Sequence, residues 1–370
     1  MSFYEIYRQY KEFDYDGFYS SLTGDAIRSA MDKPRKSDFD LLAMLSPQAG
    51  QEYLEEMAQR ANELTIRNFG KTILMFTPLY LANYCENACI YCGFNRTNHI
   101  SRSLLSMEEV EREGRAIQEM GVRHIIILTG ESHKVTPPSY IADCARILKK
   151  YVSSICIEVY SLTQEEYATL YEAGVDSFTM FQETYNEDIY PILHPSGPKH
   201  DYRTRLDSPE KACIAQYRSV NLGALLGLDE WRREVFYTAL HAKYLAERYP
   251  GTDVAVSLPR IRPCAGESAF QPKCEVDDRA IVQAMTALRL FLPRLGITVS
   301  TRETPEFRDN LIGLGVTKMS AGSVTEVGGH ADAPKTEGQF EISDPRSVPE
   351  MAEAIRRRGY QCVFKDWDGI

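Results

Sequence analysis

The sequence lacks any run of eighteen apolar residues, about the length that a helix needs to cross a bilayer. Its start, MSFYEIYRQYKEFDYDGFY, is aromatic and charged and shows no basic segment followed by an apolar one, as a secretory signal would. An excess of positive charge is also missing, since the formal net charge is -10. Because nucleic-acid backbones are bound through Lys and Arg, we expect no nucleic-acid partner and no membrane, and we expect a cytoplasmic protein.

The chain also lacks linkers, internal repeats and low-complexity tracts. What remains is the composition of an ordinary globular protein, 44% hydrophobic and 25% charged. Its 370 residues fit one large (β/α)₈ unit with appendages. The nine cysteines are an odd number, and those without pairing rhythm predict reduced thiols: Cys144, Cys156, Cys213, Cys264, Cys274 and Cys362.

Eight β-rich runs alternate with helical segments. We expect strands over 72–80, 124–129, 154–160, 177–182, 222–227, 253–258, 297–301 and 317–321. We expect helices over 163–174, 208–220 and 277–292, and another that starts with a Ser106–Glu109 capping box and ends at Gly121. Alternating strands and helices pair in parallel through right-handed crossovers. The pattern therefore predicts an α/β fold, a (β/α)8 TIM-type barrel, whose closure the sequence does not establish.

The two ends of the chain carry helical patterns outside this alternation. A helix predicted to start at Ser46-Pro47 and to end at Gly70 places on one face Leu54, Met57, Ala58, Ala61 and Leu64. A further helix is expected over 345–359, followed by a strand-like end. We therefore predict an N-terminal helical cap over 1–70, the barrel over 71–325 and a short C-terminal extension over 326–370.

Cys85, Cys89 and Cys92 form a C-x3-C-x2-C motif directly after the first predicted strand. This position is the C-terminal rim, where such barrels build their active sites. Three thiolates on one loop can bind three irons of a [4Fe-4S] cluster and leave the fourth iron without a protein ligand. Structural zinc needs four ligands, and near the motif His99 is the single further candidate. We favour the cluster; a non-catalytic zinc-binding scaffold and three unrelated buried cysteines are the alternatives.

The motif, followed by Gly93 and Phe94, is similar to the SAM-cleaving motif of the radical S-adenosylmethionine (SAM) superfamily. Nearly the whole chain resembles the 2-iminoacetate synthases, the tyrosine lyases of thiamine-thiazole biosynthesis. This resemblance is carried by LLAMLSP (41–47), PLYLANYC (78–85), LTGE (128–131), QETY (182–185), LPRIRPC (258–264), STRETPEFRD (300–309) and FKDWD (364–368).

The resemblance implies one [4Fe-4S] cluster and SAM, which is cleaved reductively to 5′-deoxyadenosine and methionine. It implies that the Cα–Cβ bond of L-tyrosine is cleaved to 2-iminoacetate (dehydroglycine) and p-cresol. An electron donor such as flavodoxin or ferredoxin and thiazole synthase, which uses the imine, are the implied partners. A related enzyme for an aromatic amino acid, of the tryptophan lyase or deazaflavin F0 synthase type, is the alternative. Cys362 stands alone near the C-terminus, so we expect no second cluster.

The resemblance also implies SAM contacts at the strand ends. Thr129, Gly130 and Glu131 resemble the Gly-Gly-Glu motif that binds the SAM ammonium, with a plain strand-ending turn as the alternative. Glu158 is a charge in an apolar strand, where burial is costly without a partner such as the SAM ribose hydroxyls. Glu183, between Gln182 and Thr184, is expected either to line the same cavity or to lie in an exposed turn.

Arg205 resembles the residue that pairs with the SAM carboxylate, and a guanidinium suits that task because it binds a carboxylate bidentately. A solvated arginine at a helix start is its alternative. The run from Leu225 to Leu228 offers an apolar surface for adenine, but plain barrel core is the interpretation that we favour. No catalytic residue is assigned beyond the cluster and SAM.

For the substrate, Arg302 is the leading carboxylate anchor, through its match to the family's Ser-Thr-Arg-Glu segment. Ser320, with Ser323 beside it, is expected to add a hydroxyl donor near the end of the eighth strand. Tyr80 is expected to contact the substrate amino group or else to pack. Arg260 and Arg262 flank Ile261, so their side chains can diverge and only one of them need enter the cavity; we assign Arg262.

Overall fold

The computed structural model describes residues 2–263, 270–334 and 336–365. Cys264 and residues 366–368 of the FKDWD segment lie outside the described residues. Its strands are β1 (Thr72–Ala82), β2 (His124–Thr129), β3 (Ser154–Glu158), β4 (Ser177–Glu183), β5 (Ser219–Ala224), β6 (Asp253–Ser257), β7 (Gly296–Val299), β8 (Lys318–Ser320) and β9 (Gln361–Val363).

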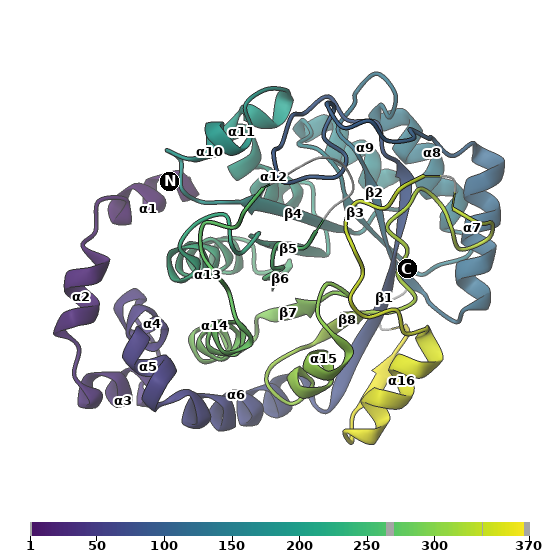
Figure 1. Ribbon diagram of the computed structural model, residues 1–370. Helices are drawn as coiled ribbons and strands as arrows, with labels where there is room; N and C mark the ends of the chain where they lie inside the picture. The colour runs from purple at the N-terminus through teal and green to yellow at the C-terminus, as the bar shows by residue number, and fades with distance from the viewer. Residues whose placement is uncertain (1, 264–269, 335, 366–370) are drawn as a thin grey trace.

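The first eight strands form a closed parallel barrel, which is seen end-on in Figure 1. Each strand from β2 to β7 pairs in parallel with the next, and β1 closes the ring by pairing with both β2 and β8. The predicted (β/α)8 barrel is confirmed. The short β9 pairs with the first residues of β1, Thr72 to Leu74, and extends the sheet beyond the ring.

Six helices precede the barrel: α1 (Phe3–Tyr10), α2 (Tyr15–Ser21), α3 (Gly24–Asp32), α4 (Asp38–Leu45), α5 (Pro47–Glu52) and α6 (Leu54–Phe69). Those between the barrel strands are α7 (Met107–Glu119), α8 (Pro138–Leu148), α9 (Gln164–Glu172), α10 (Tyr190–Leu193), α11 (Tyr202–Leu206), α12 (Ser208–Ile214), α13 (Trp231–Arg248), α14 (Asp278–Phe291) and α15 (Pro305–Leu311). A 3₁₀ turn, η1 (Pro198–His200), lies before α11, and α16 (Val348–Arg357) precedes β9.

The helix ends follow local chemistry. Ser106 Oγ accepts a hydrogen bond from the backbone N–H of Glu109, whose carboxylate accepts one from the backbone N–H of Ser106. This capping box satisfies two N–H groups that the first turn of α7 would otherwise leave unpaired, as the sequence predicts. The same arrangement of Thr163 and Glu166 starts α9.

Three element boundaries predicted from the sequence are wrong. The fifth strand begins at Ser219 and not at residue 222, and the helix expected over 208–220 ends at Ile214. Ser219 and Asn221 line the cavity, so the first half of β5 is polar, and the apolar run over 222–227 covers the end of the strand and the loop after it. The helix expected from Pro47 to Gly70 is two helices, because the backbone leaves helical geometry at Tyr53 (φ -119°, ψ 5°).

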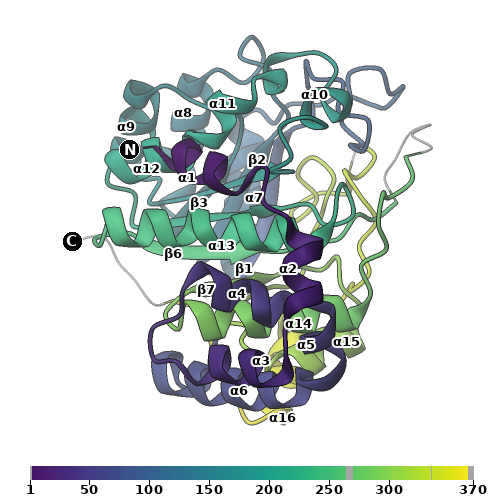
Figure 2. The ribbon, with the colours of Figure 1, turned by 90° about the vertical axis from the view of Figure 1, so that its left-hand side faces the viewer.

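The N-terminal helices wrap around one side of the barrel, as Figures 1 and 2 show. Helix α1 packs on α13, α4 packs on α13 and α14, and α6 packs on α14. They therefore cover the flank of the barrel that carries β5 to β7. The boundaries at 70 and 325 stay a prediction. Among the described helices, none has the length and apolar character that would let it span a membrane.

Candidate active site

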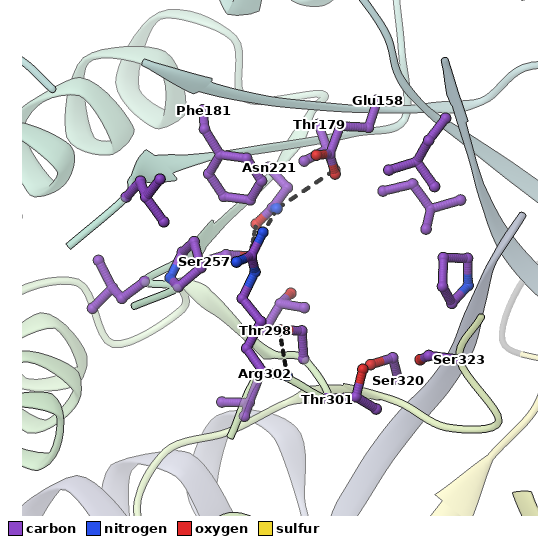
Figure 3. A pocket seen from close by; sticks show the side chains of 18 of the residues that line it. Glu158, Thr179, Phe181, Asn221, Ser257, Thr298, Thr301, Arg302, Ser320 and Ser323 are labelled. Atoms are coloured by element: carbon purple, nitrogen blue, oxygen red, sulfur yellow. Dashed lines mark hydrogen bonds between the residues drawn. The ribbon is translucent and has the colours of Figure 1, made fainter. Parts of the chain in front are cut away.

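A cavity of about 220 Å³ lies inside the barrel and reaches the C-terminal ends of its strands. One wall, from β1 and β2, is apolar and contains Phe76, Pro78, Ile126 and Leu128. The lumen of a (β/α)₈ barrel is ordinarily filled by layers of bulky side chains. An open and partly polar lumen is therefore the feature that marks the site (Figure 3).

The three cysteines of the motif lie on the loop between β1 and α7. Cys92 lines the cavity and Cys89 is buried. Burial raises the pKa of each thiol, for Cys89 to about 12, and the charge of neighbouring cysteines raises the pKa of Cys85 and of Cys89 further. Amide groups point at two of the sulfurs: Asn87 Nδ2 lies 3.7 Å from Cys85 Sγ, and Gln339 Nε2 lies 3.8 Å from Cys92 Sγ.

This donor set fits an iron–sulfur cluster. Thiolates that are unfavourable in a buried loop become favourable as ligands of iron, and amide N–H groups near the sulfurs stabilise a cluster. Within the described part of the chain, no three His, Cys, Asp or Glu side chains are grouped to hold a single metal ion. Thiolates that bind different irons of a cube stand farther apart than ligands that share one tetrahedral ion.

The end of β2 is packed against the cysteine loop. A side chain at Gly130 would place its Cβ 2.2 Å from the carbonyl oxygen of Tyr84, so only glycine permits this approach. Glu131 Oε2 accepts a hydrogen bond of 2.6 Å from Asn87 Nδ2, and the hydroxyl of Thr129 is buried with no partner among the described residues. The predicted Thr129–Glu131 segment therefore lies beside the cysteines and not in an isolated turn.

A buried ionic cluster stands at the end of β4. Glu183, at a positive φ of 71°, accepts hydrogen bonds from Lys199 Nζ at 2.6 Å and from Arg205 Nη2 at 3.1 Å. Burial raises the pKa of Glu183, but the two cations outweigh that effect and hold it below its ordinary value. Arg205 also donates to the carbonyl oxygen of Phe181. Neither the exposed turn nor the solvated arginine of the alternative interpretations is observed.

Sequence reasoning missed Lys199, which lines the cavity. It lies in η1, and no strand end or charge pattern in the sequence indicates its position. Its pairing with Glu183 exists only because the segment from residue 193 to 199 is hydrogen-bonded to the cysteine loop. In that contact Asn87 Oδ1 accepts from the backbone N–H of Lys199 at 2.9 Å. The neighbours of Glu183 turn away from the cavity: Gln182 donates to Tyr202 and Thr184 to Glu234.

Glu158 and Arg302 are two of the charged side chains that line the cavity (Figure 3). Burial, followed by the charge of Glu183, raises the pKa of Glu158 to about 7 despite the nearby cations. The Arg302 guanidinium lies 3.5 Å above the ring centre of Phe340. Burial lowers the pKa of Arg302, and among the described residues its guanidinium has no hydrogen-bond or ion-pair partner. A partly buried cation without a counterion is a ready site for an anionic group.

The other predicted substrate residues line the same cavity as Arg302. Tyr80 donates a hydrogen bond of 2.7 Å to Gln339, and the hydroxyls of Ser320 and Ser323 are buried with no partner among the described residues. Arg262 lines the cavity and donates to the carbonyl oxygen of Arg302 at 2.6 Å.

Arg262 is also paired with a carboxylate: its Nη2 donates to Glu303 at 3.1 Å. It therefore supports the loop that carries Arg302. Arg260 turns to Glu303 and Asp278. Leu225 lines the cavity, while Leu226 belongs to the main core.

Comparison with known proteins agrees with this geometry. Residues 79–240 match the family model of the radical SAM superfamily, and residues 257–361 match the Biotin and Thiamin Synthesis associated domain. The chain is 38% identical to 2-iminoacetate synthase of Escherichia coli K12 over 97% of its length and 96% of that protein. The same figures hold for 2-iminoacetate synthase of Salmonella typhimurium LT2.

The fold is shared with the FeFe-hydrogenase maturase HydG from Carboxydothermus hydrogenoformans. The TM-score is 0.85 at 30% identity, over 98% of this chain and 83% of the other. The family that the motifs predict is confirmed by the identity to the two synthases, which extends over nearly the whole of both chains. This chain belongs to the 2-iminoacetate synthase family of radical SAM enzymes.

Proposed function

We propose that this protein is a radical SAM lyase that cleaves the Cα–Cβ bond of L-tyrosine to 2-iminoacetate and p-cresol for the thiazole of thiamine. The observation that carries the proposal is the guanidinium of Arg302, which has no hydrogen-bond or ion-pair partner within the described residues and shares its cavity with Cys92 and the hydroxyl of Ser320. An amino acid brings a carboxylate for the guanidinium and an ammonium for the polar groups around it.

The radical SAM family implies SAM and a [4Fe-4S] cluster. We assign one cluster to Cys85, Cys89 and Cys92. When bound, the cluster and SAM supply hydrogen-atom abstraction through reductive cleavage of SAM to methionine and 5′-deoxyadenosine. For SAM we assign contacts to the ends of three strands and to α11: Thr129, Gly130, Glu131, Glu158, Glu183 and Arg205.

The residues of this chain bind the two zwitterions, SAM and L-tyrosine, at separate positions in the cavity. We assign Arg205 to the SAM carboxylate. Glu183, which is itself paired with Lys199, fixes the position of the Arg205 guanidinium. Arg302 forms the charge-assisted contact to the tyrosine carboxylate. Ser320 and Tyr80 complete the substrate contacts, and Arg262 keeps the Arg302 loop in place. An amino acid held in a fixed pose loses its rotational freedom before the reaction, which is a large part of catalysis by orientation.

The barrel also excludes water. The wall of Phe76, Ile126 and Leu128 offers no hydrogen-bonding side chain, so a reactive carbon centre beside it is protected from side reactions. Burial raises the pKa of Glu158 to about 7, and its carboxylate is the acceptor that we assign to the SAM ribose hydroxyls. An electron donor such as flavodoxin or ferredoxin is the proposed source of the electron. Thiazole synthase is the proposed acceptor of the imine.

Product analysis tests the proposal. The anaerobically reconstituted protein is incubated with SAM, a reductant and either L-tyrosine or L-tryptophan. We expect p-cresol and glyoxylate, the hydrolysis product of the imine, from tyrosine alone. Accumulation of 5′-deoxyadenosine without p-cresol would contradict the proposal, and products formed from tryptophan would favour the related lyase.

A further inference from the structure

The inner surface of the barrel has a row of polar side chains opposite its apolar wall. Four consecutive strands, β4 to β7, each contribute polar side chains that line the cavity, among them Thr179, Asn221, Ser257 and Thr298 (Figure 3). We call these four residues the polar belt. Layers of branched apolar side chains ordinarily occupy this level of a (β/α)₈ barrel. Small polar residues in their place need a reason other than packing.

The polar belt is internally connected. Asn221 Nδ2 donates to Ser257 Oγ at 2.9 Å and to Thr179 Oγ1 at 3.5 Å, and Ser257 Oγ lies 3.3 Å from Asn221 Oδ1. Thr298 pairs in register with Ser257 on the next strand. Each belt oxygen has two lone pairs, so the belt holds more acceptor capacity than these bonds use.

The depth of the polar belt suits the far end of an amino-acid side chain. Thr298 lies within β7, whereas Arg302 lies in the turn that follows the C-terminal end of that strand. An amino acid whose carboxylate contacts Arg302 therefore extends its side chain toward the belt. On the way, an aromatic ring would lie against the apolar wall of Phe76, Ile126 and Leu128. From the rim inward, the cavity thus presents the cation of Arg302, then the apolar wall and then the polar belt.

We infer that the polar belt binds the phenolic hydroxyl of the substrate and selects tyrosine over phenylalanine. The inference rests on the proposed function, because it takes tyrosine as the substrate. A phenol both donates and accepts, and so can join the Asn221–Ser257 pair without loss of its bonds. A ring without the hydroxyl would leave buried polar groups without that partner, and sites built in this way reject such analogues strongly.

Equilibrium binding of the two amino acids tests the inference. The Kd values of L-tyrosine and L-phenylalanine are measured by equilibrium dialysis on the reconstituted holoenzyme with SAM, without reductant. In Asn221→Leu we expect the preference for tyrosine over phenylalanine to fall at least tenfold, with phenylalanine bound as well as before or more tightly. Ser257→Ala removes one hydroxyl without adding volume and should lower the same ratio. Asn310→Leu, an identical change on the outer helix α15, is the matched control.

Two results separate the inference from the proposed function. Suppose that either belt variant keeps its iron and shows the wild-type ratio of the Kd values for tyrosine and phenylalanine. The polar belt then does not recognise the phenolic hydroxyl, and the proposed function still stands if the wild type makes p-cresol. If the wild type makes no p-cresol, the proposed function fails first. A variant that loses its iron is replaced by Thr179→Val, to which the same two expectations apply.

Discussion

Lys199 Nζ donates a hydrogen bond of 2.6 Å to Glu183 Oε1, and this contact joins the segment after α10 to the end of β4. Both side chains are nearly buried, with exposed fractions of 12% and 11%. Arg205 shares the same carboxylate oxygen at 3.1 Å. Glu183 therefore balances two buried cations at the edge of the proposed SAM site.

Replacement of Glu183 by Gln should destabilise the fold by about 3 kcal/mol, because it leaves two buried cations without a counterion. The free energy of unfolding is measured by urea denaturation without oxygen. Lys150→Met is the control, since Lys150 and Glu111 form an exposed pair at 3.9 Å, for which less than about 1 kcal/mol is expected. Equal effects of the two changes would mean that the buried cluster contributes no more than a surface pair.

Arg302→Ala should weaken tyrosine binding by about a hundredfold or more, because a charge-assisted contact to the carboxylate is lost. The iron content should stay that of the wild type, since among the described residues Arg302 forms no hydrogen bond with the cysteine loop. Equilibrium dialysis measures the Kd of tyrosine, and an iron assay measures the iron content per chain. Arg357→Ala, on the exposed face of α16, is the control. Unchanged tyrosine affinity would remove Arg302 from the site.

The charge of Glu158 should make stability depend on pH. Its pKa is raised from 4.5 to about 7 by burial, so the folded protein holds this proton more tightly than the unfolded chain. The unfolding free energy contributed by Glu158 therefore falls as pH rises from about 4.5 to about 7, by about 3 kcal/mol in total. Glu158→Gln should raise the unfolding free energy at pH 8. Below pH 4.5 it should leave that free energy unchanged, because the protonated Glu158 side chain is then as neutral as its Gln replacement.

Urea denaturation of the SAM-free protein at several pH values measures this difference. The exposed Glu247→Gln is the control, which should show no such trend. A gain from Glu158→Gln that is the same at every pH would point to packing and not to charge.

Cys85→Ala, Cys89→Ala and Cys92→Ala should each abolish the cluster, because two thiolates cannot hold a cube that needs three. Iron analysis after anaerobic reconstitution should find about four iron atoms per chain in the wild type and almost none in the variants. Cys362→Ala, on β9 and far along the chain from the motif, should keep the wild-type content. A colourless wild type that holds zinc would support the scaffold alternative.

Gly130→Ala should displace the cysteine loop, because the added Cβ would meet the Tyr84 carbonyl oxygen at 2.2 Å. Forced contacts of this kind cost about 1–3 kcal/mol, and here the backbone itself must move. We expect lower stability together with lower iron content. Gly251→Ala is the control, since no atom lies within 4 Å of the added Cβ. Full iron content in Gly130→Ala would show that the loop tolerates the shift.

The order of strands and helices and the position of the cysteines were readable from the sequence. Both follow from local patterns: apolar periodicity, caps such as Ser106 with Glu109, and three thiols within eight residues. The predicted charged residues at strand ends, Glu158, Glu183 and Arg302, also lie at the cavity or its edge, because parallel strands bring their carboxyl ends to one rim.

Tertiary structure alone decided which of these groups meet. Lys199 reaches Glu183 through a loop that packs on the cysteine segment, and no periodicity records such a contact. The sequence does not indicate the polar belt, because Asn221 precedes the apolar run that predicts the fifth strand. Its side chain enters the lumen only once the barrel has closed and fixed the register of β4, β5 and β6. Short-range patterns set the elements, whereas pairing between distant strands sets which side chains share a cavity.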